Sequence, residues 1–191
     1  MYSFLRLTIF CILYMSANQN LQGGSQVSLR IFKALEEEET KILSDSIEVV
    51  VFLSETCPIC RQSIKTLNKL AEKYTALGVA FTGVFPNTYI STAETRKAFA
   101  KKYQIAFPLI PDPGYKITDA LQASITPEVF IRQITNGKVL YQGKIDNMFE
   151  EVGKRRQIVT KHYVEDALIH ILQGKNPDIA YTDAIGCFIT R

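Results

Sequence analysis

The sequence predicts an α/β fold with a mixed central sheet, helices on both of its faces, and a β-hairpin followed by a helix. Three observations predict it. Short runs of β-forming residues alternate with segments of helical periodicity, which favours a sheet covered by helices on both sides. Residues 49–53 form a continuous apolar run, as expected for a strand buried on both faces. Asn136-Gly137 lies between two β-type runs, which is the strongest short-range hairpin signal.

The elements are expected in the order β-α-β-α-β-α-β-β-α, within one domain over residues 26–175 that is followed by a C-terminal tail at 176–191. Partial alternation at 27–32 is also compatible with an opening strand, and no regular pattern is visible at 146–159. The main expected strands are 49–53, 79–85, 107–110, 129–131 and 139–141.

The expected helices each have a start signal. Pro58 suits a first helical turn, because its missing N–H is not needed there. Ser91 and Glu94 have the spacing of a capping box, which predicts a helix that ends near residue 103. Asp112 is placed to cap a short helix, and Thr160 is placed to cap the last one.

Length and charge narrow the class of protein. The 191 residues are enough for one domain to bury a core without disulfide crosslinks. The net charge of +3 argues neither for nor against nucleic acid, but the tight basic run Lys154-Arg155-Arg156 is interpreted as a solvated surface and not as a nucleic-acid patch. We therefore expect no nucleic-acid partner.

Residues 1–17 are interpreted as a signal peptide. Arg6 provides a positive start, residues 7–15 are apolar, and the small residues Ser16 and Ala17 suit a cleavage site. The apolar run is short for a membrane span, which needs about 20 residues, although an uncleaved N-terminal anchor is an alternative. The chain is therefore expected in the periplasm or another extracytoplasmic compartment, with no further membrane contact.

Export makes the cysteine content informative, because disulfides persist outside the cytoplasm. Cys11 falls in the signal segment, so the exported chain keeps Cys57, Cys60 and Cys187, and an odd number leaves at least one thiol free or paired elsewhere. Cys57 and Cys60 form a Cys-x-x-Cys motif at a predicted strand-to-helix junction. The free amides at a helix start favour a thiolate at Cys57, and Cys60 is placed to attack a mixed disulfide formed there.

The Cys-x-x-Cys motif has other uses in proteins. Zinc needs four ligands, and only Cys187, His162 and His170 remain outside the motif, with no second close pair. A static structural disulfide is an open alternative. Haem attachment is excluded because Arg61, not a histidine, follows Cys60. We therefore expect neither a metal nor a cofactor.

Thr126-Pro127 precedes the first strand of the predicted hairpin. A cis bond there would place the neighbouring backbone against the two cysteines and would offer a strand edge to a peptide substrate. Only about 5–6% of X-Pro bonds are cis, so an ordinary trans proline at the start of a strand is the alternative.

Several segments along the chain fit the pattern of one family. They are Cys57-Pro58-Ile59-Cys60, Phe107-Pro108-Leu109-Ile110-Pro111-Asp112, Thr126-Pro127-Glu128-Val129-Phe130, Asn136-Gly137, Tyr141-Gln142-Gly143-Lys144-Ile145-Asp146, Gly153-Lys154-Arg155-Arg156 and Gly186-Cys187-Phe188-Ile189. Over about residues 27–173 the chain resembles the redoxin family, the alkyl hydroperoxide reductase/thiol-specific antioxidant branch of the thioredoxin superfamily. It is most similar to an exported subgroup. The resemblance implies a thioredoxin-like fold, a cis bond at Pro127 and a site at Cys57.

The chain departs from thioredoxins around the motif. Thr56 stands where they have a tryptophan, and the predicted strand at 49–53 lacks the acidic residue that they carry. Another group, such as Glu55, Glu128 or water, is then needed to handle the proton of Cys60.

The chain also matches only half of the peroxiredoxin signature Pro-x-x-x-Thr-x-x-Cys. Counted back from Cys57, Ser54 takes the place of the threonine and Val50 that of the proline, which weakens a peroxidase interpretation. The leading expectation is therefore an extracytoplasmic thiol–disulfide oxidoreductase that acts on protein or peptide substrates and is served by a redox partner. A thiol peroxidase, and a non-catalytic or copper-handling module, are the alternatives.

In the leading hypothesis each site residue has a role. Cys57 attacks the substrate, Cys60 resolves the mixed disulfide, and the backbone of Thr126 and Pro127 docks the substrate. Cys187 is a relay thiol, a buried free thiol or an intermolecular link, and these alternatives stay open.

Overall fold

The computed structural model describes residues 47–191 of the chain. The predicted signal peptide at 1–17, Cys11 and the predicted opening strand at 27–32 lie outside the described residues.

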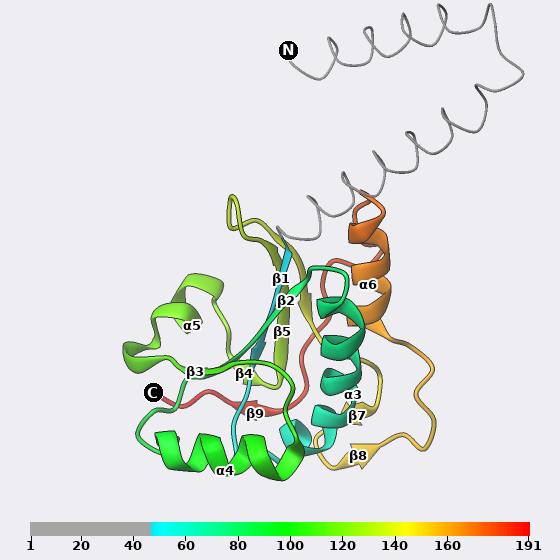
Figure 1. Cartoon of the computed structure of the whole chain (residues 1–191). Helices are drawn as coiled ribbons and strands as arrows, with labels where there is room; N and C mark the ends of the chain where they lie inside the picture. Colours follow the sequence, from blue (N-terminus) through cyan, green and yellow to red (C-terminus); the bar gives the residue numbers. More distant parts are fainter. Residues whose placement is uncertain (1–46) are drawn as a thin grey trace, which may run out of the picture. The chain divides into compact units, whose positions relative to one another are not determined.

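The described part is built on one mixed sheet. Its strands are β1 (Ile47–Phe52), β2 (Ala80–Phe85), β3 (Leu109–Pro111), β5 (Glu128–Gln133) and β6 (Val139–Gly143). In residues 47–191 they lie in the order β3-β2-β1-β5-β6, as Figure 1 shows. β2 and β3 run parallel to β1, whereas β5 runs antiparallel to it and β6 completes the predicted hairpin. The predicted mixed sheet is confirmed.

β1 at the centre of the sheet is buried on both faces, as its apolar sequence predicts. Val49 and Val51 belong to one apolar core and Val50 and Phe52 to the other, and none of the four is more than 2% exposed. A strand with no solvent-facing side fits only a sheet that helices cover from both sides.

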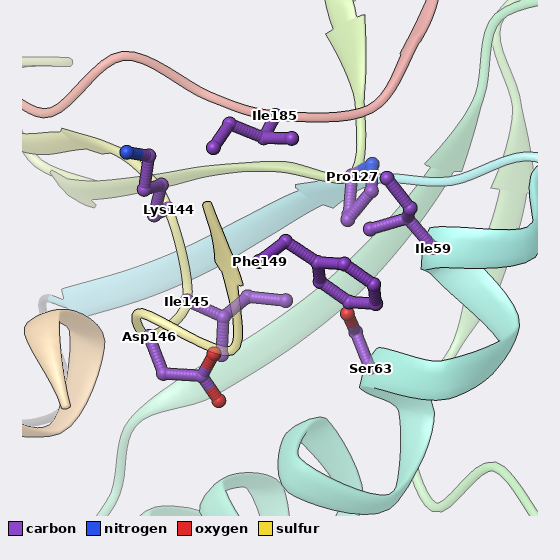
Figure 2. A pocket seen from close by; sticks show the side chains of 8 residues that line it. All are labelled: Ile59, Ser63, Pro127, Lys144, Ile145, Asp146, Phe149 and Ile185. Carbon is purple, nitrogen blue, oxygen red and sulfur yellow. The ribbon is translucent and has the colours of Figure 1, made fainter. Parts of the chain in front are cut away.

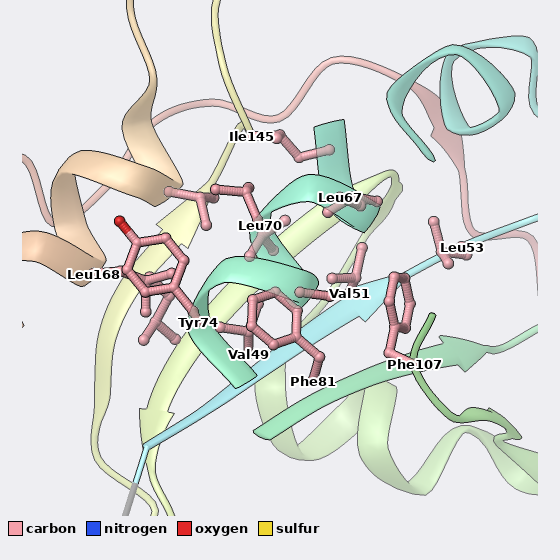
Figure 3. Packing of buried hydrophobic residues seen from close by; sticks show 14 of the residues in the cluster. Val49, Val51, Leu53, Leu67, Leu70, Tyr74, Phe81, Phe107, Ile145 and Leu168 are labelled. Carbon is pink, nitrogen blue, oxygen red and sulfur yellow. The ribbon is translucent and has the colours of Figure 1, made fainter. Parts of the chain in front are cut away.

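Helices lie on both faces. α3 (Pro58–Thr75) and α6 (Tyr163–Leu172) pack against the face of Val49 and Val51, where Figure 3 shows Leu70, Tyr74 and Leu168 around these valines. α5 (Lys116–Leu121) covers the opposite face, which holds Val50 and Phe52. α4 (Ala93–Tyr103) joins the first core mainly through a single buried aromatic side chain.

The predicted Ser91–Glu94 capping box is wrong by one residue. α4 starts after Thr92, whose side chain accepts the backbone N–H of Thr95, and Oγ1 of Thr95 in turn accepts the backbone N–H of Thr92. The Ser91 hydroxyl instead donates to Oε1 of Glu55 at 2.6 Å. Ser91 and Thr92 are adjacent hydroxyl residues. Because Ser91 bonds to Glu55, which is distant in sequence, Thr92 caps the helix instead.

The predicted cap of the last helix is also wrong. α6 starts after His162, and Oγ1 of Thr160 accepts a bond from Nδ2 of Asn147 at 2.8 Å. The prediction for Asp112 is right about its bonds and wrong about its position. Its carboxylate accepts the backbone N–H groups of Ile117 and Thr118 in the first turn of α5, but the N-cap residue of α5 is Tyr115.

Residues 146–159 are more regular than expected. β7 (Phe149–Glu151) and β8 (Lys154–Arg155) pair as a small antiparallel ribbon. Lys154 and Arg156 are exposed and form ion pairs with Glu150 at 2.6 and 2.9 Å. This short ribbon lacks the apolar alternation by which a strand is recognised from sequence.

The C-terminal tail at 176–191 runs along the sheet and then crosses its end. Thr182 and Ala180 exchange backbone hydrogen bonds with Gln142 of β6. Further on, β9 (Cys187–Phe188) pairs antiparallel with β4 (Ile125–Thr126). Nothing in the sequence predicted this second pairing.

Close approach of the tail requires a glycine at position 143. Gly143 has φ +136°, and a Cβ there would lie 2.0 Å from the carbonyl oxygen of Thr182. Gly143→Ala is therefore expected to lower the free energy of unfolding by about 1–3 kcal/mol more than Gly137→Ala. Gly137 also has a positive φ, +71°, but a Cβ there would meet nothing within 4 Å. Urea unfolding of both variants measures the difference, and equal losses would contradict the tight packing of the tail.

Candidate functional site

The Cys-x-x-Cys motif lies where β1 ends and α3 begins. Cys57 occupies the N-cap position of α3 and its carbonyl accepts the first helical bond, from the N–H of Arg61, while Pro58 fills the first turn as predicted. No acidic residue lies in that first turn, so nothing offsets the positive end of the helix dipole. Cys57 is 1% exposed and Cys60 is fully buried.

Three thiols meet at this point. Cys57, Cys60 and Cys187 are free in the structure, and the thiols of Cys60 and Cys187 both lower the pKa of Cys57. Cys187 pairs in register with Thr126, whose carbonyl oxygen lies 3.1 Å from Sγ of Cys57. Cys60 approaches from one helical turn further along α3, and Cys187 from β9 in the tail. The structure thus brings together all the cysteines that the sequence analysis singled out as site residues.

The surroundings of Cys57 favour its ionised form. The hydrogen bond from the Cys60 thiol is the largest cause, and together with the Cys187 thiol and the backbone N–H groups of Cys60 and Ile59 it lowers the pKa of Cys57 from 9.0 to about 5, against the opposing effect of burial. Donors around one sulfur therefore create the thiolate that disulfide exchange needs.

The other two thiols stay protonated. Burial, followed by the hydrogen bond with Cys57, raises the pKa of Cys60 well above 9.0. The same two causes raise the pKa of Cys187 to about 11. The site therefore holds one strong nucleophile and two thiols that donate to it.

The backbone beside the predicted proline completes the site. The Thr126-Pro127 peptide bond is cis, as the resemblance implied. Sγ of Cys57 donates to the carbonyl oxygen of Thr126 at 3.1 Å. Only a thiol can make this bond, so the contact belongs to the protonated state and opposes the donors that favour ionisation.

The strand edge at Thr126 is occupied, contrary to the expectation of an open edge. Thr126 pairs with Cys187 in the β4–β9 register, and its hydroxyl donates to the carbonyl oxygen of Cys187 at 3.3 Å. The chain's own tail lies where a substrate peptide was expected to dock.

The groups expected to handle the Cys60 proton are engaged elsewhere. Glu55 accepts bonds from Ser91 and Thr95 at the start of α4. Glu128, 4% exposed, accepts Nε2 of Gln142 at 2.8 Å.

Two other groups act on the Cys60 thiol, since the backbone of Ser54 and the side chain of Thr126 lower its pKa. These contacts were missed by the sequence analysis. Only the fold shows that Thr126, 66 positions along the chain, lies beside Cys60.

A small cavity adjoins the motif. Figure 2 shows Ile59 and Ser63 of α3 on one side of it. The rest of the lining comes from other parts of the chain: Pro127, Lys144, Ile145, Asp146, Phe149 and, from the tail, Ile185. Its volume is about 20 Å³, which is room for roughly one water molecule. In the described part no group of three or more histidine, cysteine, aspartate or glutamate side chains is arranged to hold a metal ion.

Comparison with known families decides the classification. The model of the AhpC/TSA family matches residues 30–142. The chain belongs to the AhpC/TSA family. The fold of this family member is thioredoxin-like, as predicted, and the redoxin resemblance is confirmed at the level of the family. Among residues 47–191 no helix has the length and apolar character needed to cross a bilayer.

Solved structures are similar to the chain in fold. An uncharacterized conserved protein from Geobacillus kaustophilus has 26% identity and a TM-score of 0.68, with 81% of this chain and 80% of that chain covered. A hypothetical protein from Sinorhizobium meliloti 1021 has 26% identity and a TM-score of 0.67, with coverage of 80% and 82%. A thioredoxin-like protein in the oxidized form has 17% identity and a TM-score of 0.52, with coverage of 68% of this chain and 80% of that chain. This match shows a shared fold and no more. No curated protein matches the chain.

The low pKa of Cys57 has a spectroscopic consequence. The thiolate absorbance of the reduced protein at 240 nm is expected to rise as the pH increases through about 5, because the donors around Cys57 stabilise the anion. Cys57→Ser is expected to abolish this rise. A rise that appears only above about pH 8, where ordinary thiols ionise, would contradict the assignment.

The same shift makes folding depend on pH. The folded pKa of Cys57 lies below that of the unfolded thiol, so its contribution to stability is present above the unfolded pKa and is lost as the pH falls through about 5. Thermal unfolding of the reduced protein should therefore show a Tm that rises from pH 5 to pH 8 relative to Cys57→Ser. Parallel Tm curves for the two proteins would contradict this linkage.

Proposed function

We propose that this chain is a thiol–disulfide oxidoreductase that acts on protein or peptide substrates outside the cytoplasm. The observation that carries the proposal is the pairing of a low-pKa thiol, Cys57, at a helix start with a protonated partner, Cys60, one turn deeper. Family membership supports redox chemistry at a cysteine. The signal-like residues 1–17 support the compartment.

The chemistry proceeds by two displacements. The Cys57 thiolate attacks one sulfur of a substrate disulfide, so that a mixed disulfide forms and the other substrate sulfur leaves as a thiolate. Cys60 then loses its proton to that leaving thiolate or to water and attacks Sγ of Cys57. A Cys57–Cys60 disulfide forms and the second substrate thiol is released. The reverse sequence oxidises a substrate dithiol.

Thr126 can assist the second displacement. Its hydroxyl donates to the Cys187 carbonyl at 3.3 Å, and its side chain also lowers the pKa of Cys60. A single O–H serves one acceptor at a time. Rotation of the Thr126 hydroxyl so that it donates to the Cys60 sulfur would stabilise the Cys60 thiolate that attacks Cys57.

A thiol peroxidase is the second candidate, favoured by membership of the AhpC/TSA family. The geometry supports it less, because Ser54 stands at the threonine position of the peroxiredoxin signature and its hydroxyl bonds to Thr56 at 2.9 Å rather than to Cys57. Consumption of hydrogen peroxide by the reduced chain, with sulfenic acid at Cys57, would favour this candidate over exchange.

Exchange with oxidised glutathione tests the proposal directly. At pH 7 the Cys57→Ser variant is expected to react about 10–100-fold more slowly than the wild type, because thiols with a pKa above 9 are about 1% ionised or less. All proteins carry Cys11→Ser, so that only the three described cysteines react.

Cys60→Ser is the matched control. It keeps Cys57, and the hydroxyl of the new serine can still donate to the Cys57 sulfur in place of the thiol. The variant is therefore expected to retain the first displacement, which mass spectrometry detects as a Cys57–glutathione adduct. Wild-type rates in Cys57→Ser would contradict the proposal.

A further inference from the structure

Cys57 is almost inaccessible in this structure, although the proposed exchange needs it to reach a substrate. Its side chain is 1% exposed. The carbonyl oxygen of Thr126, beside the cis proline, lies 3.1 Å from its sulfur, and Cys187 of the tail pairs with that same Thr126. Cys187 itself is only partly buried. The sulfur that faces Cys57 from outside the motif is thus one of the chain's own.

The tail is docked as an extended strand on both sides of Cys187. Before it, Gly186 lies so close to β4 that a Cβ there would be 2.1 Å from the carbonyl oxygen of Thr126. After it, the N–H of Ile189 donates to the carbonyl of Ser124 at 2.9 Å. In Figure 1 this segment, drawn in red, passes directly beside β4.

Contacts at the end of the tail hold the strand in register. Tyr115 donates to the carbonyl of Thr190 at 3.1 Å, and Arg191 forms an ion pair with Asp119. The guanidinium of Arg191 also lies 5.4 Å from the ring centroid of Tyr115. These contacts keep Cys187 at one position along the strand, opposite Thr126.

We propose that the tail is an internal substrate strand, and that Cys187 is a third redox-active cysteine which forms a disulfide with Cys57 in alternation with Cys60. This inference rests on the proposed exchange function. Thr126 pairs with Cys187 through the backbone, and the carbonyl oxygen of the same Thr126 lies 3.1 Å from Sγ of Cys57. Together these contacts reproduce, within one chain, the arrangement expected of a bound peptide thiol.

The exchange balances without an external oxidant. The sulfur of Cys187 attacks Sγ of Cys57, the Cys57–Cys60 bond breaks and the Cys57–Cys187 bond forms. Cys60 leaves as a thiolate and takes up the proton that Cys187 gives up. A Cys57–Cys187 disulfide thus replaces the Cys57–Cys60 disulfide. The sulfur bonded to Cys57 is then that of Cys187, which is partly exposed and open to a redox partner, and no longer that of the buried Cys60.

Removal of the competing thiol tests the inference. The full chain with Cys11→Ser and Cys60→Ser is incubated with a mixture of reduced and oxidised glutathione, and its disulfides are mapped by mass spectrometry. The expected product is a monomer with an intramolecular Cys57–Cys187 disulfide. A chain that stops at a Cys57–glutathione adduct, or that links Cys187 between two molecules, would overturn the proposal.

Docking of the tail is tested separately in the same background. Gly186→Val is expected to slow closure of the Cys57–Cys187 bond by about tenfold or more, because its side chain would push the strand off Thr126 and lower the effective concentration of Cys187. Phe188→Ala is the matched control, since that side chain on the same strand is 77% exposed, and it should close at the parent rate. Equal rates for the two variants would show that strand docking does not present Cys187.

The Cys187→Ser variant separates this inference from the proposed function. Reversible formation of a Cys57–Cys60 disulfide in Cys187→Ser, together with no Cys57–Cys187 bond in Cys60→Ser, would leave the oxidoreductase intact and refute the role of Cys187. Lack of reaction at Cys57 in every variant would refute both.

Discussion

The antiparallel pairing of β1 with β5 is the constraint on which the site depends. Phe52, the last residue of β1, lies opposite Glu128, the first residue of β5. The chain that leaves β1 therefore meets the chain that enters β5 at the same end of the sheet. Cys57 follows the end of β1, and Thr126-Pro127 precedes the start of β5. The register of the two strands therefore brings the Cys57 sulfur and the Thr126 carbonyl together.

This register is itself fixed by burial. Because both faces of β1 are covered, a slip of one residue would exchange the side chains of the two cores, and the two faces carry different sets of residues. The register of the sheet is thus fixed where the site needs it. The elements added around it are small: β4 and β9 are two-residue strands whose pairing depends on close backbone approach at Gly186.

The central sheet, the hairpin, the helix start at Pro58 and the motif at its N-terminus could be predicted, since each depends on apolar runs or turn residues that are close in sequence. The start of α4 could not be predicted from Ser91, because Ser91 bonds to the distant Glu55 and the neighbouring Thr92 caps the helix. The start of α6 could not be predicted from Thr160, because its hydroxyl accepts a bond from Asn147 instead. The position of Cys187 beside Thr126 could not be predicted from the sequence either. Its strand has no periodicity, and its partner Thr126 lies 61 residues away.

A thiol-trapping redox titration of the full chain, read by mass spectrometry, tests the central claim most directly. The account predicts that the disulfide at Cys57 forms and breaks reversibly within about −300 to −120 mV, the range spanned by known exchange proteins. A Cys57 that stays reduced across this range, or a disulfide there that resists reduction throughout it, would contradict exchange as the function of this site.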